Sequence, residues 1–172
     1  MTASSGAKDG VIPPGLPAPG FTLPAMGGGE ISLPDPSARG LSLYVFYKNT
    51  CPTCRLIAPL LQRLADATAG VGGRVIGISQ DGMDGARSFS QEFGLTFPIA
   101  VDGPGWPVSS QYDLVAVPTL YLVDAAGTIR SSGAGFHKER FEGMGRDLAA
   151  SWGAPAPGLY RDGESYPEMK PG

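Results

Sequence analysis

The order of apolar and polar residues divides the chain into two kinds of segment. Nearly continuous apolar runs at residues 41–47 (LSLYVFY) and 74–79 (RVIGIS) are typical of strands buried on both faces. Residues 56–65 and 84–93 instead carry apolar side chains at helical spacing, and Gly94 after the second segment is a suitable helix end. This order predicts strands alternating with helices.

Weaker patterns add shorter elements before and after these segments. They predict an N-terminal hairpin of residues 21–23 and 30–33, and a strand at 97–101 that Pro98 confines to a sheet edge or a strand start. They also predict a short helix at 107–113, a second hairpin of 120–123 and 128–132, and a closing helix at 138–152. Strands alternating with helices imply an α/β fold, in which helices cover both faces of a mixed sheet.

Glycine and proline mark the limits of this periodic region. The chain has 26 Gly and 17 Pro, and they are dense in residues 1–20 and again near the C-terminal end. We therefore expect an irregular N-terminal segment (1–20), one domain (21–152) and a Pro/Gly-rich tail (153–172). A tail of this composition is by default disordered or loosely docked, and Tyr160, Tyr166 and Met169 could alternatively pack back on the domain or contact a partner.

Charge and composition exclude several classes of function. The net charge of −3 and the absence of a Lys/Arg-rich stripe argue against a nucleic-acid partner. The apolar runs are shorter than the roughly 18 residues of a membrane span. The first residues show neither an apolar signal-peptide region nor early positive charge, which predicts a cytoplasmic protein. In a reducing cytosol a cysteine pair is more often catalytic or metal-binding than a permanent disulfide.

Both cysteines lie in the stretch TCPTC at residues 50–54, directly after the apolar run 41–47. This places them on the first turn of the following helix, with Asn49 or Thr50 as the expected N-cap. Unpaired backbone N–H groups and the helix dipole favour a thiolate there, and Lys48 adds positive charge. The position favours a reactive Cys51.

The three-residue spacing brings the two sulfurs within bonding reach, with Cys51 more exposed than Cys54. Attack by Cys51 and resolution by Cys54 is the natural division of roles. A permanent disulfide would close so short a loop that it would constrain the unfolded chain very little. A redox-active pair therefore explains the motif better.

The sequence resembles the thioredoxin superfamily, in particular its TlpA-like and redoxin (AhpC/TSA-related) branch. The likeness covers roughly residues 17–150. CPTC at Cys51–Cys54 follows a hydrophobic strand, Pro59 lies at the family's helix-kinking position, and Val117–Thr119 matches the family's Val-Pro-Thr segment. Gly133 or Gly135 follows the last hairpin, and an extra helix and strand lie between Ser79 and Val101.

The resemblance implies a three-layer thioredoxin-like fold with an N-terminal hairpin and a TlpA-type insertion. It implies a thiol–disulfide oxidoreductase that needs no cofactor or metal, and whose partners are a disulfide-containing protein or small molecule and a thiol electron donor. Val117 and Pro118 would form a cis peptide beside the disulfide and hold the substrate. Pro52 and Thr53 replace the Gly-Pro of thioredoxin, so the redox potential is not transferable.

Three alternatives remain open at this point. A peroxiredoxin-like peroxidase would use Cys51 as peroxidatic and Cys54 as resolving cysteine, but Lys48 stands where that family has threonine. A Sco-like copper module would need His137, although such proteins have CxxxC spacing. A non-catalytic interaction domain is the third alternative.

Overall fold

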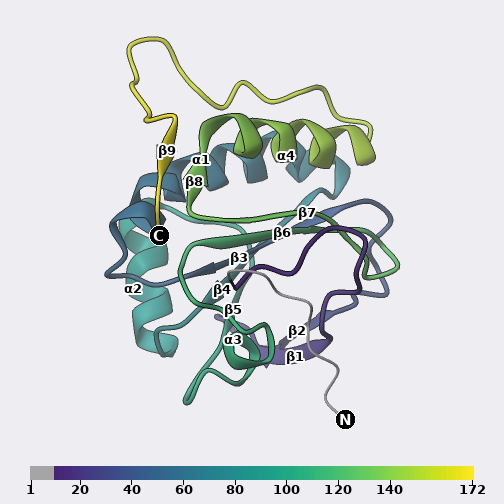
Figure 1. The fold of residues 1–172 in the computed structure, drawn as a ribbon, viewed down its shortest axis with the longest axis vertical. Helices are drawn as coiled ribbons and strands as arrows, with labels where there is room; N and C mark the ends of the chain where they lie inside the picture. Colours follow the sequence, from purple (N-terminus) through teal and green to yellow (C-terminus); the bar gives the residue numbers. More distant parts are fainter. Residues whose placement is uncertain (1–9) are drawn as a thin grey trace.

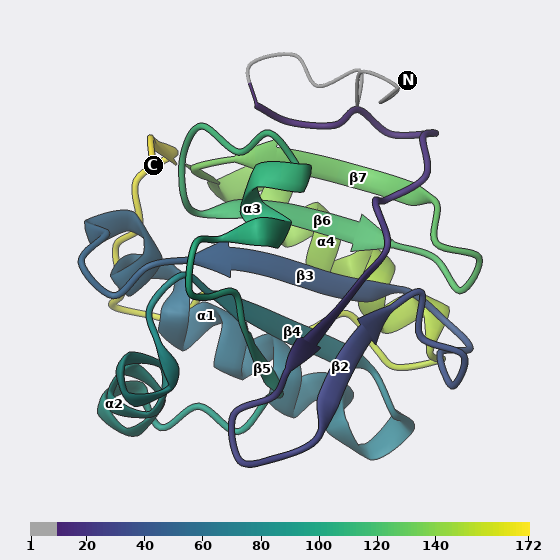
Figure 2. The same ribbon diagram turned by 90° about the horizontal axis from the view of Figure 1, so that it is seen from below.

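A five-stranded mixed sheet lies at the centre of the computed structural model, which describes residues 10–172 (Figures 1 and 2). Its strands run in the order β5-β4-β3-β6-β7. Their bounds are β3 Ser42–Tyr47, β4 Arg74–Ser79, β5 Ile99–Val101, β6 Thr119–Val123 and β7 Ile129–Ala134. Strands β4 and β5 join β3 in parallel, whereas β6 and β7 pair antiparallel. The predicted mixed sheet is confirmed, and the Pro98-led strand lies at its edge.

Helices and the N-terminal segment cover the two faces of this sheet (Figure 2). One core contains side chains of α1 (Pro52–Thr68), α2 (Met83–Phe93) and α4 (Lys138–Ser151). The other contains side chains of α3 (Pro107–Gln111) and of the N-terminal segment. Because residues 43–47 of β3 alternate between these two cores, both faces of the strand carry apolar or aromatic side chains, as its sequence predicted.

The N-terminal hairpin consists of β1 (Phe21–Pro24) and β2 (Glu30–Leu33), paired antiparallel as predicted. It reaches the central sheet at β5, where Met26 N donates to the Ile99 carbonyl at 2.8 Å. Residues preceding it run beside β7, and Ile12 among them is 1% exposed. The hairpin therefore extends the second face of the fold.

The helix and strand predictions agree with the structure to within a few residues at each end. Gly94 ends α2 with a φ of 63°, the left-handed conformation that glycine adopts without strain. Helix α1 ends at Thr68, followed by a short 3-10 turn, η1 (Ala69–Val71). No helix in residues 10–172 has the length and apolar character needed to cross a bilayer.

The prediction for the C-terminal tail differs from the structure. Leu159 is 2% exposed and belongs to the core beneath α1 and α4. The last tail residues form β9 (Met169–Lys170), which pairs antiparallel with β8 (Phe136–His137). Figure 1 shows the tail, in yellow, running back along α4. The expectation of a loosely docked tail is wrong because apolar tail side chains find partners on the domain.

Candidate redox site

Cys51 caps the N-terminus of α1. The helix begins at Pro52, and the Cys51 sulfur accepts a hydrogen bond from the backbone N–H of Cys54 at 3.1 Å. The N-cap predicted at Asn49 or Thr50 is therefore wrong by one or two residues. A sulfur at this position accepts a hydrogen bond from an otherwise unpaired helix N–H.

Cys54 lies beneath Cys51 and is 2% exposed, whereas Cys51 is partly exposed. Both are free thiols in this structure. Burial raises the pKa of the Cys54 thiol well above its ordinary value, and its contact with Cys51 raises it further. The two sulfurs thus differ in access, as the sequence predicted: the outer one is open to a partner and the inner one is held as a neutral thiol.

The segment expected beside the thiols is there. The Val117–Pro118 peptide bond is cis, and the Cys51 thiol donates to the Val117 carbonyl at 3.2 Å. Gly135 N donates to the Pro118 carbonyl at 2.8 Å, which ties this segment to the end of β7. Two regions more than sixty residues apart in sequence therefore meet at one sulfur atom.

The loop before Cys51 is braced by the inserted helix α2. Asn49 N donates to the Asp81 carboxylate at 2.8 Å, and the Asn49 side-chain amide donates to the Gly85 carbonyl at 2.9 Å. An added Cβ on Gly85 would lie 2.6 Å from Asp81 Cβ, so glycine is needed for this close approach. These hydrogen bonds hold the loop between β3 and Cys51 against the start of α2.

A groove of about 590 Å³ lies beside Val117. Lys48 and Trp106 form one wall, with the Lys48 ammonium 5.4 Å from the centre of the Trp106 ring. The Trp106 indole donates to the Gln80 carbonyl at 2.7 Å. Val115, which also lines the groove, is 74% exposed. Lys48 therefore faces this groove, and exposed apolar surface adjoins the thiols.

The remaining predicted site residues are distributed along α1. Pro52 is exposed at its first position, and Pro59 lies inside the helix among buried residues. Thr53 is 2% exposed, and its hydroxyl donates to the Pro171 carbonyl at 2.6 Å. No pattern in the sequence predicts this contact with the tail.

A metal site finds little support in this arrangement. Within residues 10–172 no group of three or more His, Cys, Asp or Glu side chains is placed to hold a metal ion. His137 is exposed at the N-cap position of α4, as expected for a solvated residue at a helix start. The Sco-like alternative is thus left without a ligand set in the part of the chain described.

Comparison with known proteins agrees with the fold. Residues 14–132 match the AhpC/TSA family. The thioredoxin-like protein YneN of Bacillus subtilis is 30% identical over 72% of each chain. A protein named "Putative peroxiredoxin" from Mycobacterium tuberculosis is 32% identical over 70% of this chain and 76% of its own.

A solved structure gives the same picture of the fold. The thioredoxin domain of a thiol-disulfide oxidoreductase from Bacteroides vulgatus superposes with a TM-score of 0.66, at 23% identity, over 74% of this chain and 91% of that one. This likeness shows a thioredoxin-like fold, and the two free thiols lie in contact at the N-terminus of α1. The chain belongs to the AhpC/TSA family, within the redoxin branch of the thioredoxin superfamily.

Proposed function

We propose that the protein exchanges disulfides with a protein or small-molecule partner through the Cys51–Cys54 pair. The observation that carries this proposal is the contact of one half-exposed sulfur with both a helix N-terminus and the Val117 carbonyl. The first contact holds the sulfur at the open end of the helix, and the second places backbone polar groups beside it for an incoming chain.

The reaction proceeds in two exchanges. The Cys51 thiolate attacks one sulfur of the partner disulfide, forming a mixed disulfide and releasing the other sulfur as a thiolate. Cys54 then loses its proton and attacks Cys51 Sγ, so that the Cys51–Cys54 disulfide forms and the second partner thiol leaves. Two electrons pass to the partner, and an external thiol donor restores the dithiol.

Burial of Cys54 has a clear role in this sequence. Because its pKa is raised, the inner thiol stays protonated and does not compete with Cys51 for the partner disulfide. It becomes the nucleophile only when a mixed disulfide on Cys51 lies directly above it. The geometry therefore supports Cys51 as the attacking residue and Cys54 as the resolving residue.

Trapping of mixed disulfides tests the assignment. Cys54→Ser leaves the attacking thiolate without its resolving partner, so we expect it to accumulate mixed disulfides with a disulfide-bonded protein such as insulin. Cys51→Ser should accumulate none. Non-reducing gels and mass spectrometry of the two variants provide the measurement. Equal trapping by both variants, or by neither, would contradict the assigned roles.

A thiol peroxidase is the second candidate, favoured by the family match and by the relative named as a peroxiredoxin. Peroxide would oxidise Cys51 to a sulfenic acid, and Cys54 would condense with it to give the disulfide and water. Lys48 occupies the position at which peroxiredoxins have a threonine, which weighs against this activity. If the wild-type protein consumed peroxide far faster than free cysteine does, thiol peroxidase would replace disulfide exchange as the preferred function.

A further inference from the structure

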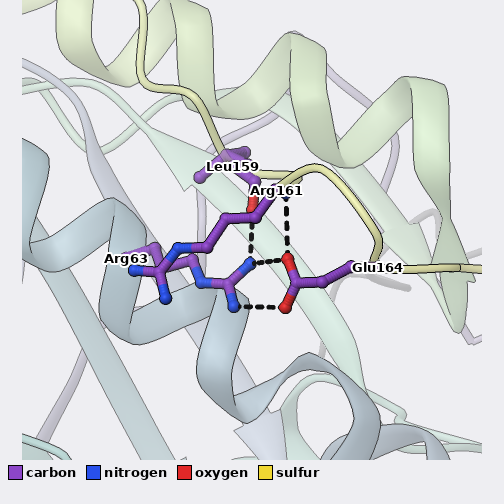
Figure 3. Close-up of polar contacts among 4 residues, drawn as sticks. All are labelled: Arg63, Leu159, Arg161 and Glu164. Carbon is purple, nitrogen blue, oxygen red and sulfur yellow. Dashed lines mark hydrogen bonds and ion pairs between the residues drawn. The ribbon is translucent and has the colours of Figure 1, made fainter.

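The tail is fixed to the domain at several points before it reaches the thiols. Arg63 on α1 forms a bidentate ion pair with Glu164, and its guanidinium also donates to the Leu159 carbonyl at 2.8 Å (Figure 3). Arg161 N donates to the Glu164 carboxylate at 2.9 Å, as Figure 3 also shows. Bidentate geometry fixes direction as well as distance, so this contact sets the path of the chain beyond Glu164.

Aromatic contacts continue the path toward the site. The Tyr166 ring lies 5.5 Å from the Tyr160 ring and 6.2 Å from that of Phe136, centre to centre. The Tyr160 hydroxyl donates to the Lys138 carbonyl at 3.0 Å. These contacts bring the tail to the start of α4, immediately beside β8.

The last residues then lie as an extended strand across the site. Lys138 N donates to the Glu168 carbonyl at 2.9 Å, and β9 pairs with β8 in antiparallel register. The Pro171 carbonyl accepts from the Thr53 hydroxyl at 2.6 Å. The tail thus pairs with a strand edge on one side and, on the other, accepts a hydrogen bond from Thr53, one of the two residues between the cysteines.

Gly172 completes the contact by lying against the Val117 carbonyl. A Cβ added to Gly172 would be 2.2 Å from this oxygen and 3.3 Å from Pro118 N. The same carbonyl accepts the hydrogen bond of the Cys51 thiol. Tail and attacking sulfur therefore meet at one backbone group, where the proposed function places the substrate.

On the basis of that proposed function, we propose that the β8 edge, the Thr53 hydroxyl and the Val117 carbonyl form a groove for an extended segment of a disulfide-bearing protein, and that residues 168–172 fill this groove as an intramolecular competitor. A partner binds by adding a strand to β8 in place of β9. It presents a carbonyl to Thr53 and a small residue opposite Val117, as the tail does.

This arrangement has a measurable cost for protein substrates. The apparent affinity for a protein substrate equals the intrinsic affinity multiplied by the fraction of molecules in which the tail leaves the groove open. If the tail occupies the groove in about nine-tenths of the molecules, the apparent affinity falls about tenfold. A small disulfide that needs no strand pairing should be affected much less. The tail would then select partners with a segment able to replace it.

Matched glycine substitutions in the full-length chain test the competition. Gly172→Val places a side chain against the Val117 carbonyl, whereas Gly158→Val, in the same tail, adds one where no atom lies within 4 Å of an added Cβ. We expect Gly172→Val to raise kcat/KM for insulin about threefold to tenfold and to leave that for a small aromatic disulfide within about twofold. Gly158→Val should match wild type with both.

A chain ending at Pro167 provides the second variant. It keeps the contacts of Leu159, Glu164 and Tyr166 but lacks β9, and circular dichroism and thermal unfolding check that its domain is intact. The fluorescently labelled peptide of residues 164–172 should bind this chain at least about fivefold more tightly than the full-length protein, and unlabelled peptide should inhibit insulin reduction by the shortened chain competitively. A peptide with the same residues in scrambled order should do neither.

The outcomes separate the two proposals. Equal kcat/KM for insulin in wild type and the shortened chain, with no peptide binding, would overturn the competition while leaving the oxidoreductase function in place. Inactivity of every chain toward both disulfides would overturn the proposed function. Peptide binding, which needs no turnover, would still report whether the tail and a free segment share the groove.

Discussion

Cys51 and Cys54 differ because one forms the end of a helix and the other lies inside its first turn. The cap position leaves Cys51 partly exposed, in contact with the Cys54 N–H and the Val117 carbonyl. Three residues later, Cys54 points into the core formed by α1 and the sheet. A reactivity difference between two identical side chains thus follows from helix geometry.

This difference predicts selective alkylation. At pH 7.5 iodoacetamide should modify Cys51 at least about tenfold faster than Cys54, because burial raises the pKa of Cys54 and only the thiolate reacts. Peptide mass spectrometry over a time course measures both rates. In urea the two cysteines should react alike, and comparable labelling of Cys54 in the folded protein would refute the description of the inner thiol.

The short helix α3 near the site is held by one buried carboxylate, that of Asp102. Asp102, which follows β5, is 0% exposed and accepts hydrogen bonds from Val108 N, Ser109 N and the Ser109 hydroxyl at 2.6–3.0 Å. These N–H groups lie at the start of α3, immediately after Trp106. Asp102 therefore holds the helix that carries one wall of the groove beside Val117.

Removal of this carboxylate should destabilise the domain. Asp102→Ala leaves two backbone donors without acceptors, and each buried unpaired donor costs about 1–3 kcal/mol, so we expect a loss of at least about 2 kcal/mol in the free energy of unfolding. Urea denaturation measures it. Asp102→Asn keeps one acceptor oxygen and should fall between Ala and wild type. A change below about 0.5 kcal/mol for Ala would show that α3 does not depend on this cap.

Elements with strong periodicity were predictable from sequence, whereas contacts between distant short segments were not. The apolar run of β3 and the spaced residues of α1 leave few alternatives, so their type and order are confirmed. The cap at Cys51 was missed because Ser, Thr, Asn and Asp usually fill that position. Strands β8 and β9 contain two residues each, too few for any alternation to be visible.

The site shows the same limit. The chemistry of Cys51 and Cys54 and the cis bond at Pro118 were expected, because a short motif and a family resemblance identify them. The contact of the tail with the site was not expected, since it depends on residues such as Thr53 and Pro171, 118 residues apart. Gly/Pro-rich composition predicts weak intrinsic order, but a few buried anchors such as Leu159 override it.

At the scale of the whole molecule, the tail joins the far end of α4 to the thiols. Its course depends on the Arg63–Glu164 ion pair, whose side chains are 15% and 31% exposed, so that water and salt still reach it. Hydrogen bonding from Arg63, with a further contribution from Arg161 N, lowers the pKa of Glu164 from 4.5 to about 2. The docked tail therefore favours the carboxylate form of Glu164, which links tail position to pH.

The direction of this linkage gives the last prediction. Because the pKa is lowered on docking, the contribution of Glu164 is fully present above about pH 4.5 and is lost as the pH falls from there toward about 2. The Tyr166 ring resonances and the Lys138 amide resonance in NMR spectra should move toward those of the released tail over this range. In Glu164→Gln these resonances should already lie at the positions of the released tail at pH 7, and they should show no pH transition from residue 164.

Two controls separate tail release from other effects of acid. Asp84→Asn removes a different exposed carboxylate, one paired with Arg87 on α2, and should keep the wild-type transition. Far-UV circular dichroism distinguishes tail release from acid unfolding of the domain. Added salt should weaken docking in wild type more than in Glu164→Gln, because screening acts on the ion pair. Identical pH profiles for wild type and Glu164→Gln would show that the aromatic contacts and β9 hold the tail without this anchor.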